Sequence, residues 1–353
     1  MERLNVCIIG TGTISDLHFK AYQANEHVHL RGVYDYSVER AEKKAKEYEA
    51  DIVYHSLDEV FQDSQVDAVS ICTWNNTHTD LTIKALHAGK HVLVEKPLSM
   101  NVEEANQVEK AAKQSDKIVQ VGFVRRFGTN TKVLKSFIDE GQLGEIYYAK
   151  ASCLRRHGNP GGWFANKEKS GGGPLIDLGV HVIDICWYLM GRPKVKTITG
   201  NTYTKLGNRA NVKNLSFYKA ADYDARKNSV EDLANALITF ENGASLMVDV
   251  SYTLHAKEDE VGVKLYGTKG GAELEPALKI ITEANDTILN IDPQIDHLSF
   301  DFENAFQNEI DQFVRSCLFE EETVAPVEDG VEMMKILCGI YEAAEKKSEV
   351  VFQ

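Results

Sequence analysis

The sequence is short of basic residues, and this shortage excludes one class of partner. Its 353 residues contain 39 Lys and Arg against 53 Asp and Glu, which gives a formal net charge of −14. Phosphate binding depends mainly on lysine and arginine, so this balance argues against nucleic acid or an anionic membrane surface as the main partner. We therefore expect no nucleic-acid partner and no membrane partner.

Long apolar runs and paired cysteines are also missing. The first apolar run covers residues 6–9, far short of the roughly 20 residues that a spanning helix needs. No charged head and apolar core of a secretory signal precede it. The six cysteines are scattered without a CxxC pair, which argues against a disulfide framework and a zinc pattern. We expect reduced thiols and a cytoplasmic location.

The first third of the chain alternates apolar strands with helical segments. Helices of this length between strands indicate βαβ units, and hence a parallel, doubly wound sheet. The predicted strands are 4–9, 28–34, 52–54, 66–72, 91–95 and 118–121, and the predicted helices are 16–24, 38–48, 79–88 and 102–114.

Beyond about residue 145 the strands are longer and little helix separates them, which predicts a mostly antiparallel sheet. We therefore expect an α/β protein with two domains, residues 1–122 and 123–353, with packing of the C-terminal helices back on the first domain as an open alternative. Strands are predicted at 145–154, 194–204, 233–240, 244–253 and 261–266, helices at 175–189, 302–318 and 331–346, and a long loop at 205–228.

A glycine-rich turn follows the first strand and opens the first helix. It reads Gly10-Thr11-Gly12-Thr13-Ile14-Ser15. Gly10 permits the tight turn, Gly12 lets the backbone approach a pyrophosphate, and the helix N-terminus supplies N–H groups. The context of strand, turn and helix favours a dinucleotide site over a glycine turn that binds nothing.

Asp35 lies 20 residues after Ser15, at the end of the second predicted strand. A carboxylate there can accept both ribose hydroxyls of NAD and would repel the 2′-phosphate of NADP. The next two residues, Tyr36 and Ser37, offer no cation, and we interpret Arg40 as a solvated charge on a helix. NAD is therefore the expected cofactor, with NADP less favoured.

Glu95-Lys96-Pro97 ends the strand at 91–95. Proline holds the preceding residue in an extended conformation, and ligands bind at the carboxyl ends of parallel strands. Lys96 can therefore donate to a substrate oxygen and stabilise developing alkoxide charge. On spacing alone, a surface lysine beside a proline explains the pattern equally well.

A second glycine run, residues 170–174, precedes an apolar helix that carries Asp177, His181 and Asp184. The glycines would let the backbone pass close to a ligand. Asp177 and His181 are four residues apart and share one helix face, and burying such groups unpaired is costly. This favours a histidine general base with a carboxylate partner. A self-satisfied core pair and, less favoured, a metal site are the alternatives, and we expect no metal.

In this order, these elements resemble the glucose–fructose oxidoreductase/inositol dehydrogenase (Gfo/Idh/MocA) family, over nearly the whole chain. The resemblance rests on the dinucleotide loop, on the segment at 72–78 with Trp74 where the family usually has proline, on the block at 88–97 that ends in Glu-Lys-Pro, on the glycine run and helix at 171–184, and on the segments 230–232, 240–244 and 267–270.

The resemblance implies a Rossmann NAD-binding domain, and a substrate domain whose large open sheet commonly forms an oligomer interface, here a homodimer or homotetramer. The residues that match the family's catalytic positions are Lys96, Asp177 and His181, and the peptide before Pro97 is expected to be cis. The expected cofactor-binding residues are Gly10, Thr11, Gly12, Thr13, Ile14, Asp35, Thr73, Trp74, Asn75, His78, Glu95 and Lys96. Arg125 and Arg126 match a segment near the substrate cleft, and the expected substrate-binding residues are Arg125, Arg156, His157, Trp163, Asp177 and His181.

The resulting hypothesis is an NAD-dependent dehydrogenase that acts on a CH–OH group of a sugar, sugar derivative or cyclitol. His181 would take the hydroxyl proton, Asp177 would orient the imidazole, and Lys96 would donate to the same oxygen. A sugar sensor that binds nucleotide without catalysis, an NAD-dependent glycosidase and a diol dehydrogenase remain as rival functions.

Overall fold

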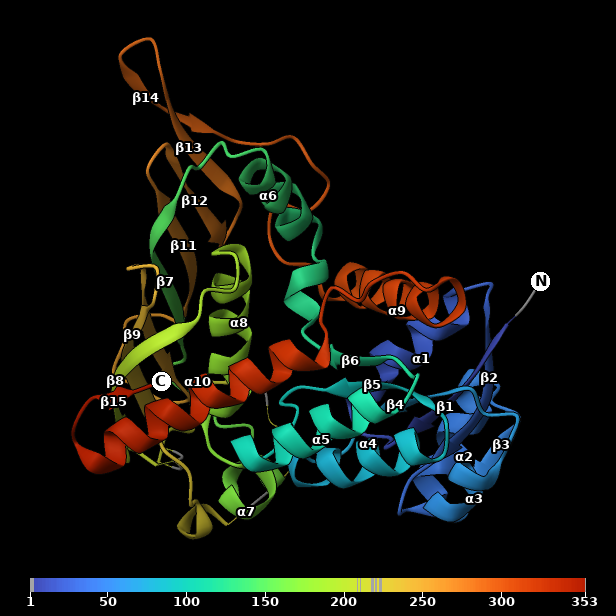
Figure 1. The fold of residues 1–353 in the computed structure, drawn as a ribbon. Coiled ribbons are helices and arrows are strands. Elements are labelled where there is room, and N and C mark those ends of the chain that lie inside the picture. Colours follow the sequence, from blue (N-terminus) through green and yellow to red (C-terminus); the bar gives the residue numbers. More distant parts are fainter. Residues whose placement is uncertain are drawn as a thin grey trace. The chain divides into compact units, whose positions relative to one another are not determined.

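The computed structural model describes residues 3–207, 209, 211–216, 219, 221 and 224–352, and they form two compact units (Figure 1). The N-terminal unit runs to Phe127 and also includes Phe302–Met334. The C-terminal unit contains Gly128–Asp301 and the chain from Lys335 onward. Each unit has its own sheet.

The N-terminal unit is built on a six-stranded, fully parallel sheet with the strand order β3-β2-β1-β4-β5-β6. This order is that of a doubly wound sheet and confirms the predicted fold. The short helix α3 was not predicted, because six residues are too few to show a helical period. The strands are β1 Leu4–Ile9, β2 Val28–Tyr34, β3 Ile52–Tyr54, β4 Ala68–Ile71, β5 His91–Glu95 and β6 Val119–Gly122, and the helices are α1 Ser15–Ala24, α2 Val38–Tyr48, α3 Leu57–Gln62, α4 His78–His87 and α5 Val102–Gln114.

One apolar core of this unit lies between the sheet and three helices. Val6 and Ile8 of β1 pack in one buried cluster with Phe19 of α1 and Tyr48 of α2, whose rings stack at 4.6 Å. Helix α9, Phe302–Phe319, adds Phe313 to this cluster. The helix therefore folds with the N-terminal unit although it follows the second sheet in the chain, because its apolar face completes this core.

The register of the sheet aligns the carboxyl ends of its central strands. Ile9 of β1 lies beside Tyr34 of β2 and Ile71 of β4, and Ile71 lies beside Val94 of β5. The residues that follow these four therefore form a row along one edge: Gly10, Asp35, Cys72 and Glu95.

The C-terminal unit holds a nine-stranded sheet with the order β14-β13-β12-β11-β7-β10-β9-β8-β15. All neighbouring pairs are antiparallel except β7 and β10, so the predicted mostly antiparallel sheet is confirmed. The strands are β7 Ile146–Leu154, β8 Val195–Tyr203, β9 Leu233–Phe240, β10 Ser245–Ser251, β11 Glu260–Gly267, β12 Gly270–Glu275, β13 Lys279–Ala284, β14 Thr287–Ile291 and β15 Val350–Val351.

Helices cover one face of this sheet. Helix α8, Val180–Leu189, packs on β7, β10 and β11, and α6, Thr129–Asp139, packs on β12. Helix α6 and strands β12 to β15 are additions to the predicted elements. A short helix α7, Lys167–Ser170, precedes the glycine run, and helix α10 is Val327–Lys346.

The predicted loop at 205–228 lies partly outside the described residues, which leave out residues 208, 210, 217–218, 220 and 222–223.

In the part of the chain that the structure describes, no helix combines the length and apolar character that a bilayer span requires.

We predict that His91 makes the stability of the N-terminal unit depend on pH. The Ile118 N–H donates to His91 Nδ1 at 3.0 Å, so this nitrogen must be unprotonated. Burial, and secondarily the Lys117 charge, lower the pKa of His91 to about 4. The unfolded chain, with a histidine pKa near 6.5, binds the proton first as pH falls. The contribution of neutral His91 to the free energy of unfolding is therefore complete above about pH 6.5 and is lost progressively as the pH falls toward about 4.

The variant His91→Asn keeps an acceptor near the Nδ1 position and removes the titration. Urea unfolding of both proteins should give similar stability at neutral pH and a smaller loss for the variant in acid. His55→Asn, which removes an exposed histidine, is the control. Stability curves of wild type and His91→Asn that run parallel from pH 7 to pH 4.5 would contradict the prediction.

Candidate active site

The turn after β1 has the geometry of a phosphate-binding loop. Gly10 has φ +97°, and a Cβ there would lie 2.6 Å from the Cys72 carbonyl oxygen, so only glycine fits. No atom lies within 4 Å of the place that a Cβ on Gly12 would take, so the backbone is open to a ligand there. Helix α1 starts at Ser15. The N–H groups of Ser15, Asp16 and Leu17 already donate to the preceding turn, so this helix start offers an anion chiefly the positive end of its dipole. A pyrophosphate fits this cradle.

Asp35 is held firmly at the end of β2. Its Oδ2 accepts from Thr11 N, Thr11 Oγ1 and Arg40 Nη2, each at 2.8 Å, and its Oδ1 accepts from Ser37 N at 2.8 Å. Burial raises the pKa of Asp35, but the hydrogen bonds from Ser37, Arg40 and Thr11 outweigh it and hold the pKa below its ordinary value. The carboxylate is therefore ionised and held in one orientation at the end of β2.

The interpretation of Arg40 as a solvated charge was wrong. Arg40 lies in the first turn of α2, which begins at Val38. Long side chains on a helix point back toward its N-terminus, so the guanidinium reaches the carboxylate that ends β2. The pairing of Arg40 with Asp35 places a cation beside the ribose acceptor.

Two buried histidines anchor the Glu-Lys-Pro turn, and sequence reasoning missed the first. His18 of α1 is fully buried, with Nε2 2.9 Å from Glu95 Oε1 and Nδ1 2.9 Å from Ser70 Oγ. On the other side, His78 Nδ1 lies 2.7 Å from the Pro97 carbonyl oxygen. Lys96 itself is half-buried, and the Lys96–Pro97 peptide is cis, as the resemblance implies. The turn that carries Lys96 is therefore tied down on both sides.

The segment after β4 contributes the other residues expected at the cofactor. His78 is fully buried, and its Nε2 lies 3.2 Å from the Thr73 carbonyl oxygen. Burial outweighs its hydrogen bonds and lowers the pKa of His78, so its ring is a neutral link between this segment and the proline turn. Asn75 is buried, and the Trp74 ring centroid is 6.0 Å from that of Tyr36.

In the C-terminal unit the glycine run packs against the protein itself. A Cβ on Gly172 would lie 2.0 Å from the Tyr341 hydroxyl, and one on Gly173 would lie 2.6 Å from the Glu231 carbonyl oxygen. The expectation that these glycines admit a ligand is therefore corrected at both positions. The Glu231 carboxylate accepts from Gly173 N, Leu175 N and the Tyr341 hydroxyl, so it anchors the start of the helix.

That helix begins with a π-helical segment, Leu175–Gly179, and continues as α8, whereas one continuous helix was predicted. Wide turns of this kind occur often at functional sites. Asp177 and His181 are half-buried, and every other residue from 175 to 187, Asp184 included, is buried. The two predicted catalytic residues of this unit therefore stand out from an otherwise apolar helix.

Tyr252 contacts Asp177, although no sequence pattern indicated that it belongs to the candidate site. Its side chain is fully buried directly after β10, and its hydroxyl donates to Asp177 Oδ2 at 3.0 Å. Burial, and then the Asp177 charge, raise the pKa of Tyr252 far above its ordinary value. Tyr252 is therefore a permanent donor that orients the Asp177 carboxylate.

The residues of the C-terminal unit that are expected to bind substrate differ in their contacts and in their burial. Arg156 Nη1 donates to the Lys257 carbonyl oxygen at 2.6 Å, and the half-buried Trp163 stacks on Phe164 with 4.0 Å between ring centroids. His157 is buried, and this burial, together with the Arg209 charge, lowers the pKa of His157.

Arg125 and Arg126 lie in the N-terminal unit. Arg125 is half-buried. Arg126 is almost fully buried and binds Asp329 and the Val324 carbonyl oxygen, so it supports the fold of this unit. Across the described residues, no three His, Cys, Asp or Glu side chains are grouped to hold a metal ion.

Residues 4–123 match the family model described as an oxidoreductase family with an NAD-binding Rossmann fold, and residues 131–273 match the GFO/IDH/MocA C-terminal domain. The chain is 32% identical to D-glucoside 3-dehydrogenase of Escherichia coli K12 over 350 residues, which cover 98% of this chain and 97% of that one. It is 25% identical to myo-inositol 2-dehydrogenase of Thermotoga maritima, covering 98% and 96% of the two chains.

Solved structures agree on the fold. A levoglucosan dehydrogenase in complex with NADH and levoglucosan superposes with a TM-score of 0.86 at 22% identity, over 99% of each chain. Together the comparisons confirm the resemblance inferred from the motifs, the oxidoreductase class with its sugar and inositol dehydrogenases, and NAD as cofactor.

Proposed function

This chain belongs to the Gfo/Idh/MocA family of NAD-binding oxidoreductases, and from that premise we propose that it oxidises or reduces a carbinol carbon of a sugar, sugar derivative or cyclitol. The observation that carries the proposal is the pair Asp177 and His181, which are only half-buried on an otherwise buried helix and of which Asp177 accepts a hydrogen bond from Tyr252. A glucoside is the favoured substrate, because the similarity to D-glucoside 3-dehydrogenase spans nearly all of both chains.

The N-terminal unit would hold the cofactor. The turn of Gly10 to Ile14 would bind the pyrophosphate and Asp35 the adenosine ribose, while Thr73, Trp74, Asn75 and the Glu95-Lys96 pair border the same edge of the sheet or the loops beside it. Bound NAD supplies the hydride acceptor. Binding, orientation and proton transfer remain the task of the protein side chains.

The C-terminal unit would supply the proton acceptor. During oxidation His181 takes the proton of the substrate hydroxyl, and Asp177 orients and electrostatically supports the imidazole. Lys96 donates to the same oxygen and stabilises its developing negative charge. Arg125, Arg156, His157 and Trp163 would contact the remaining hydroxyls of the substrate.

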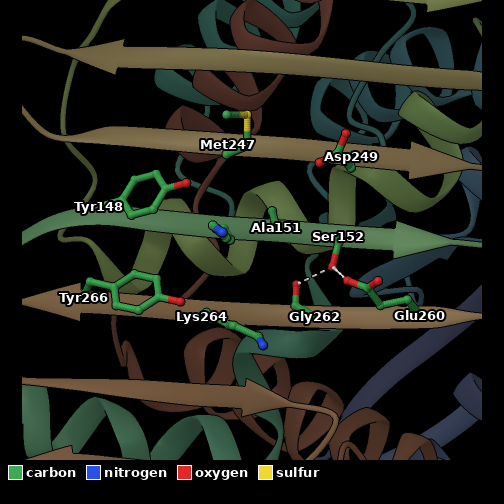
Figure 2. Close-up of a pocket in the computed structure, with 10 residues that line it drawn as sticks. Tyr148, Ala151, Ser152, Met247, Asp249, Glu260, Gly262, Lys264 and Tyr266 are labelled. Atoms are coloured by element: carbon green, nitrogen blue, oxygen red, sulfur yellow. Dashed lines mark hydrogen bonds between the residues drawn. The ribbon is translucent and has the colours of Figure 1, made fainter.

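We further propose that the chain forms a homodimer or homotetramer through its large sheet. One face of the sheet carries α6 and α8, and the other exposes a hollow of about 420 Å³ that Tyr148, Lys150, Met247, Asp249, Glu260 and Tyr266 help to line (Figure 2). Aromatic, apolar and oppositely charged side chains together suit an interface between two identical copies.

A cytoplasmic location is also proposed. None of the six cysteines, all of which lie in the described part of the chain, forms a disulfide, and four of them are buried: Cys7, Cys72, Cys153 and Cys186. Such thiols suit a reducing compartment.

The activity is tested by mixing the protein with NAD and a panel of glucosides, free hexoses and inositols, and measuring NADH absorbance. We expect turnover on at least one glucoside or cyclitol. His181→Asn should lower kcat by about 100-fold or more without weakening NAD binding, and Lys96→Met should lower kcat by a similar factor. Lys113→Met, an exposed lysine on α5, is the control. Release of free sugar without net NADH would contradict the dehydrogenase proposal, as would full turnover by the His181 variant.

Tyr252→Phe tests the support of Asp177. The ring stays buried and only the hydroxyl is lost, so we expect folding and NAD affinity to be retained. A hydrogen bond to a charged group contributes about 1.5–3 kcal/mol, so kcat should fall roughly 10-fold to 100-fold with little change in KM. Tyr54→Phe, which removes a buried hydroxyl bound to the Asp63 carboxylate in the N-terminal unit, is the control. An unchanged kcat and pH profile for Tyr252→Phe would remove Tyr252 from the proposed site.

The interface is tested by light scattering. Met247 is 37% exposed within the lined hollow, and Val38, at 37% exposed, lies on a helix of the other unit. Met247→Asp should lower the molar mass of the assembly, because a charge would enter the apolar part of the interface, while Val38→Asp should not. A monomeric wild-type protein would contradict the proposal, and so would a Met247→Asp variant that keeps the assembly intact.

A further inference from the structure

Strands β7 and β10 run parallel and end side by side, which brings Arg155 next to Tyr252. Leu154, the last residue of β7, pairs with Ser251, the last residue of β10. Arg155 N donates to the Ser251 carbonyl oxygen and to Ser251 Oγ, each at 3.1 Å, and Ser251 Oγ donates to the Arg155 carbonyl oxygen at 3.0 Å. The Arg155 backbone is therefore fixed beside the tyrosine that binds Asp177.

The side chain of Arg155 is also held in place. Its stem packs on Gly158, where a Cβ would lie 2.7 Å from Arg155 Cδ, and its Nη1 donates to the Gly158 carbonyl oxygen at 3.3 Å. Burial and then the Asp177 charge raise the pKa of Tyr252, and the Arg155 charge opposes them. The guanidinium therefore lies within electrostatic reach of the Tyr252 hydroxyl, at the candidate active site of this unit.

The Arg155 guanidinium uses little of its hydrogen-bonding capacity within the protein. It has five N–H donors, and toward the described residues it makes one hydrogen bond, to the Gly158 carbonyl oxygen, and no ion pair. The side chain is nonetheless half-buried, and a cation held away from water without an anion is costly. An anionic group of a ligand would therefore complete this site, as a carboxylate of the protein does for other arginines of the chain. Those arginines are Arg31, Arg40, Arg126, Arg226 and Arg315.

The neighbouring arginines are directed at backbone carbonyl groups. Arg156 Nη1 donates to the Lys257 carbonyl oxygen at 2.6 Å. Arg209 Nη1 donates to the carbonyl oxygens of Arg156 and Leu254. Among the described residues of this segment, Arg155 is therefore the cation best placed for a ligand. Its planar fork matches a carboxylate in a bidentate fashion, and its single charge balances the single charge of that group.

We propose that Arg155 binds a carboxylate of the substrate, so that the preferred substrate is a uronic acid or its glycoside rather than a neutral glucoside. The carboxylate is not the reacting group. The carbinol carbon still passes its hydride to NAD, and its hydroxyl still passes its proton to His181. The inference rests on the proposed function and names the substrate class within it.

The test measures NADH formation with methyl hexosides, the matching methyl hexuronides and the matching 6-phosphates, in the gluco and galacto configurations. Within one configuration, wild type should show a kcat/KM for the hexuronide at least about tenfold above that for the hexoside, because a charge-assisted hydrogen bond is the stronger one. The KM of the hexuronide should also rise with added salt.

Arg155→Gln removes the charge and keeps a polar side chain. It should lower kcat/KM for the hexuronide about tenfold or more and change kcat/KM for the hexoside by less than about threefold. Arg155→Lys, which keeps the charge but loses the planar fork, should lie between. Arg226→Gln, which removes an exposed arginine paired with Asp224, is the matched control and should leave the ratio of the two substrates unchanged.

Gly158→Ala tests the geometry with the arginine still present. The added Cβ would displace the Arg155 stem, so the KM of the hexuronide should rise while that of the hexoside changes little.

A wild type that uses a neutral hexoside, a cyclitol or a 6-phosphate as well as or better than the hexuronide would overturn this inference and leave the dehydrogenase proposal standing. An Arg155→Gln variant that loses the same factor on both substrates would also overturn it. Absence of turnover with every sugar and cyclitol would overturn the proposed function together with this inference.

Discussion

The parallel register of the first sheet is the constraint on which the candidate cofactor site depends. Because Ile9, Tyr34, Ile71 and Val94 lie side by side in neighbouring strands, the residues that follow them reach one edge together. Loops that are distant in sequence then become neighbours without any special contact. Hydrogen bonds between these loops add precision: Thr11 binds Asp35, and His78 links the segment after β4 to the proline turn.

Buried polar groups perform the corresponding task in each unit. His18 and Glu95 support the turn of Lys96, and Glu231 supports the start of the helix that carries Asp177 and His181. None of these supporting groups need touch a substrate. Each is costly to bury alone, so each specifies one geometry for the residue it holds, and the candidate catalytic side chains therefore stand on rigid elements.

Local sequence patterns predicted most of the fold, but they did not predict the short helix α3 or the edge strands β13 and β14. The βαβ alternation and the hairpin strands were visible because apolar periods of two and 3.6 residues survive in long segments. Helix α3 has only six residues. The five residues of β14 are all exposed although three of them are apolar, and β13 buries only one residue, so neither strand alternates clearly between apolar and polar positions. The π-helical segment at 175–179 was also hidden, because the local pattern there fits an ordinary helix.

For the site, the sequence alone supplied the candidates: residue type and spacing singled out the glycine turn, Asp35 and the pair Asp177 and His181, and the resemblance to a known family added a role for Lys96. Only the tertiary structure decided what each of these groups touches. Arg40 on Asp35, Tyr252 on Asp177 and Tyr341 against Gly172 join residues brought together by folding. A linear pattern records neighbours along the chain, whereas hydrogen bonding and burial depend on neighbours in space, and those are set by packing of the whole unit.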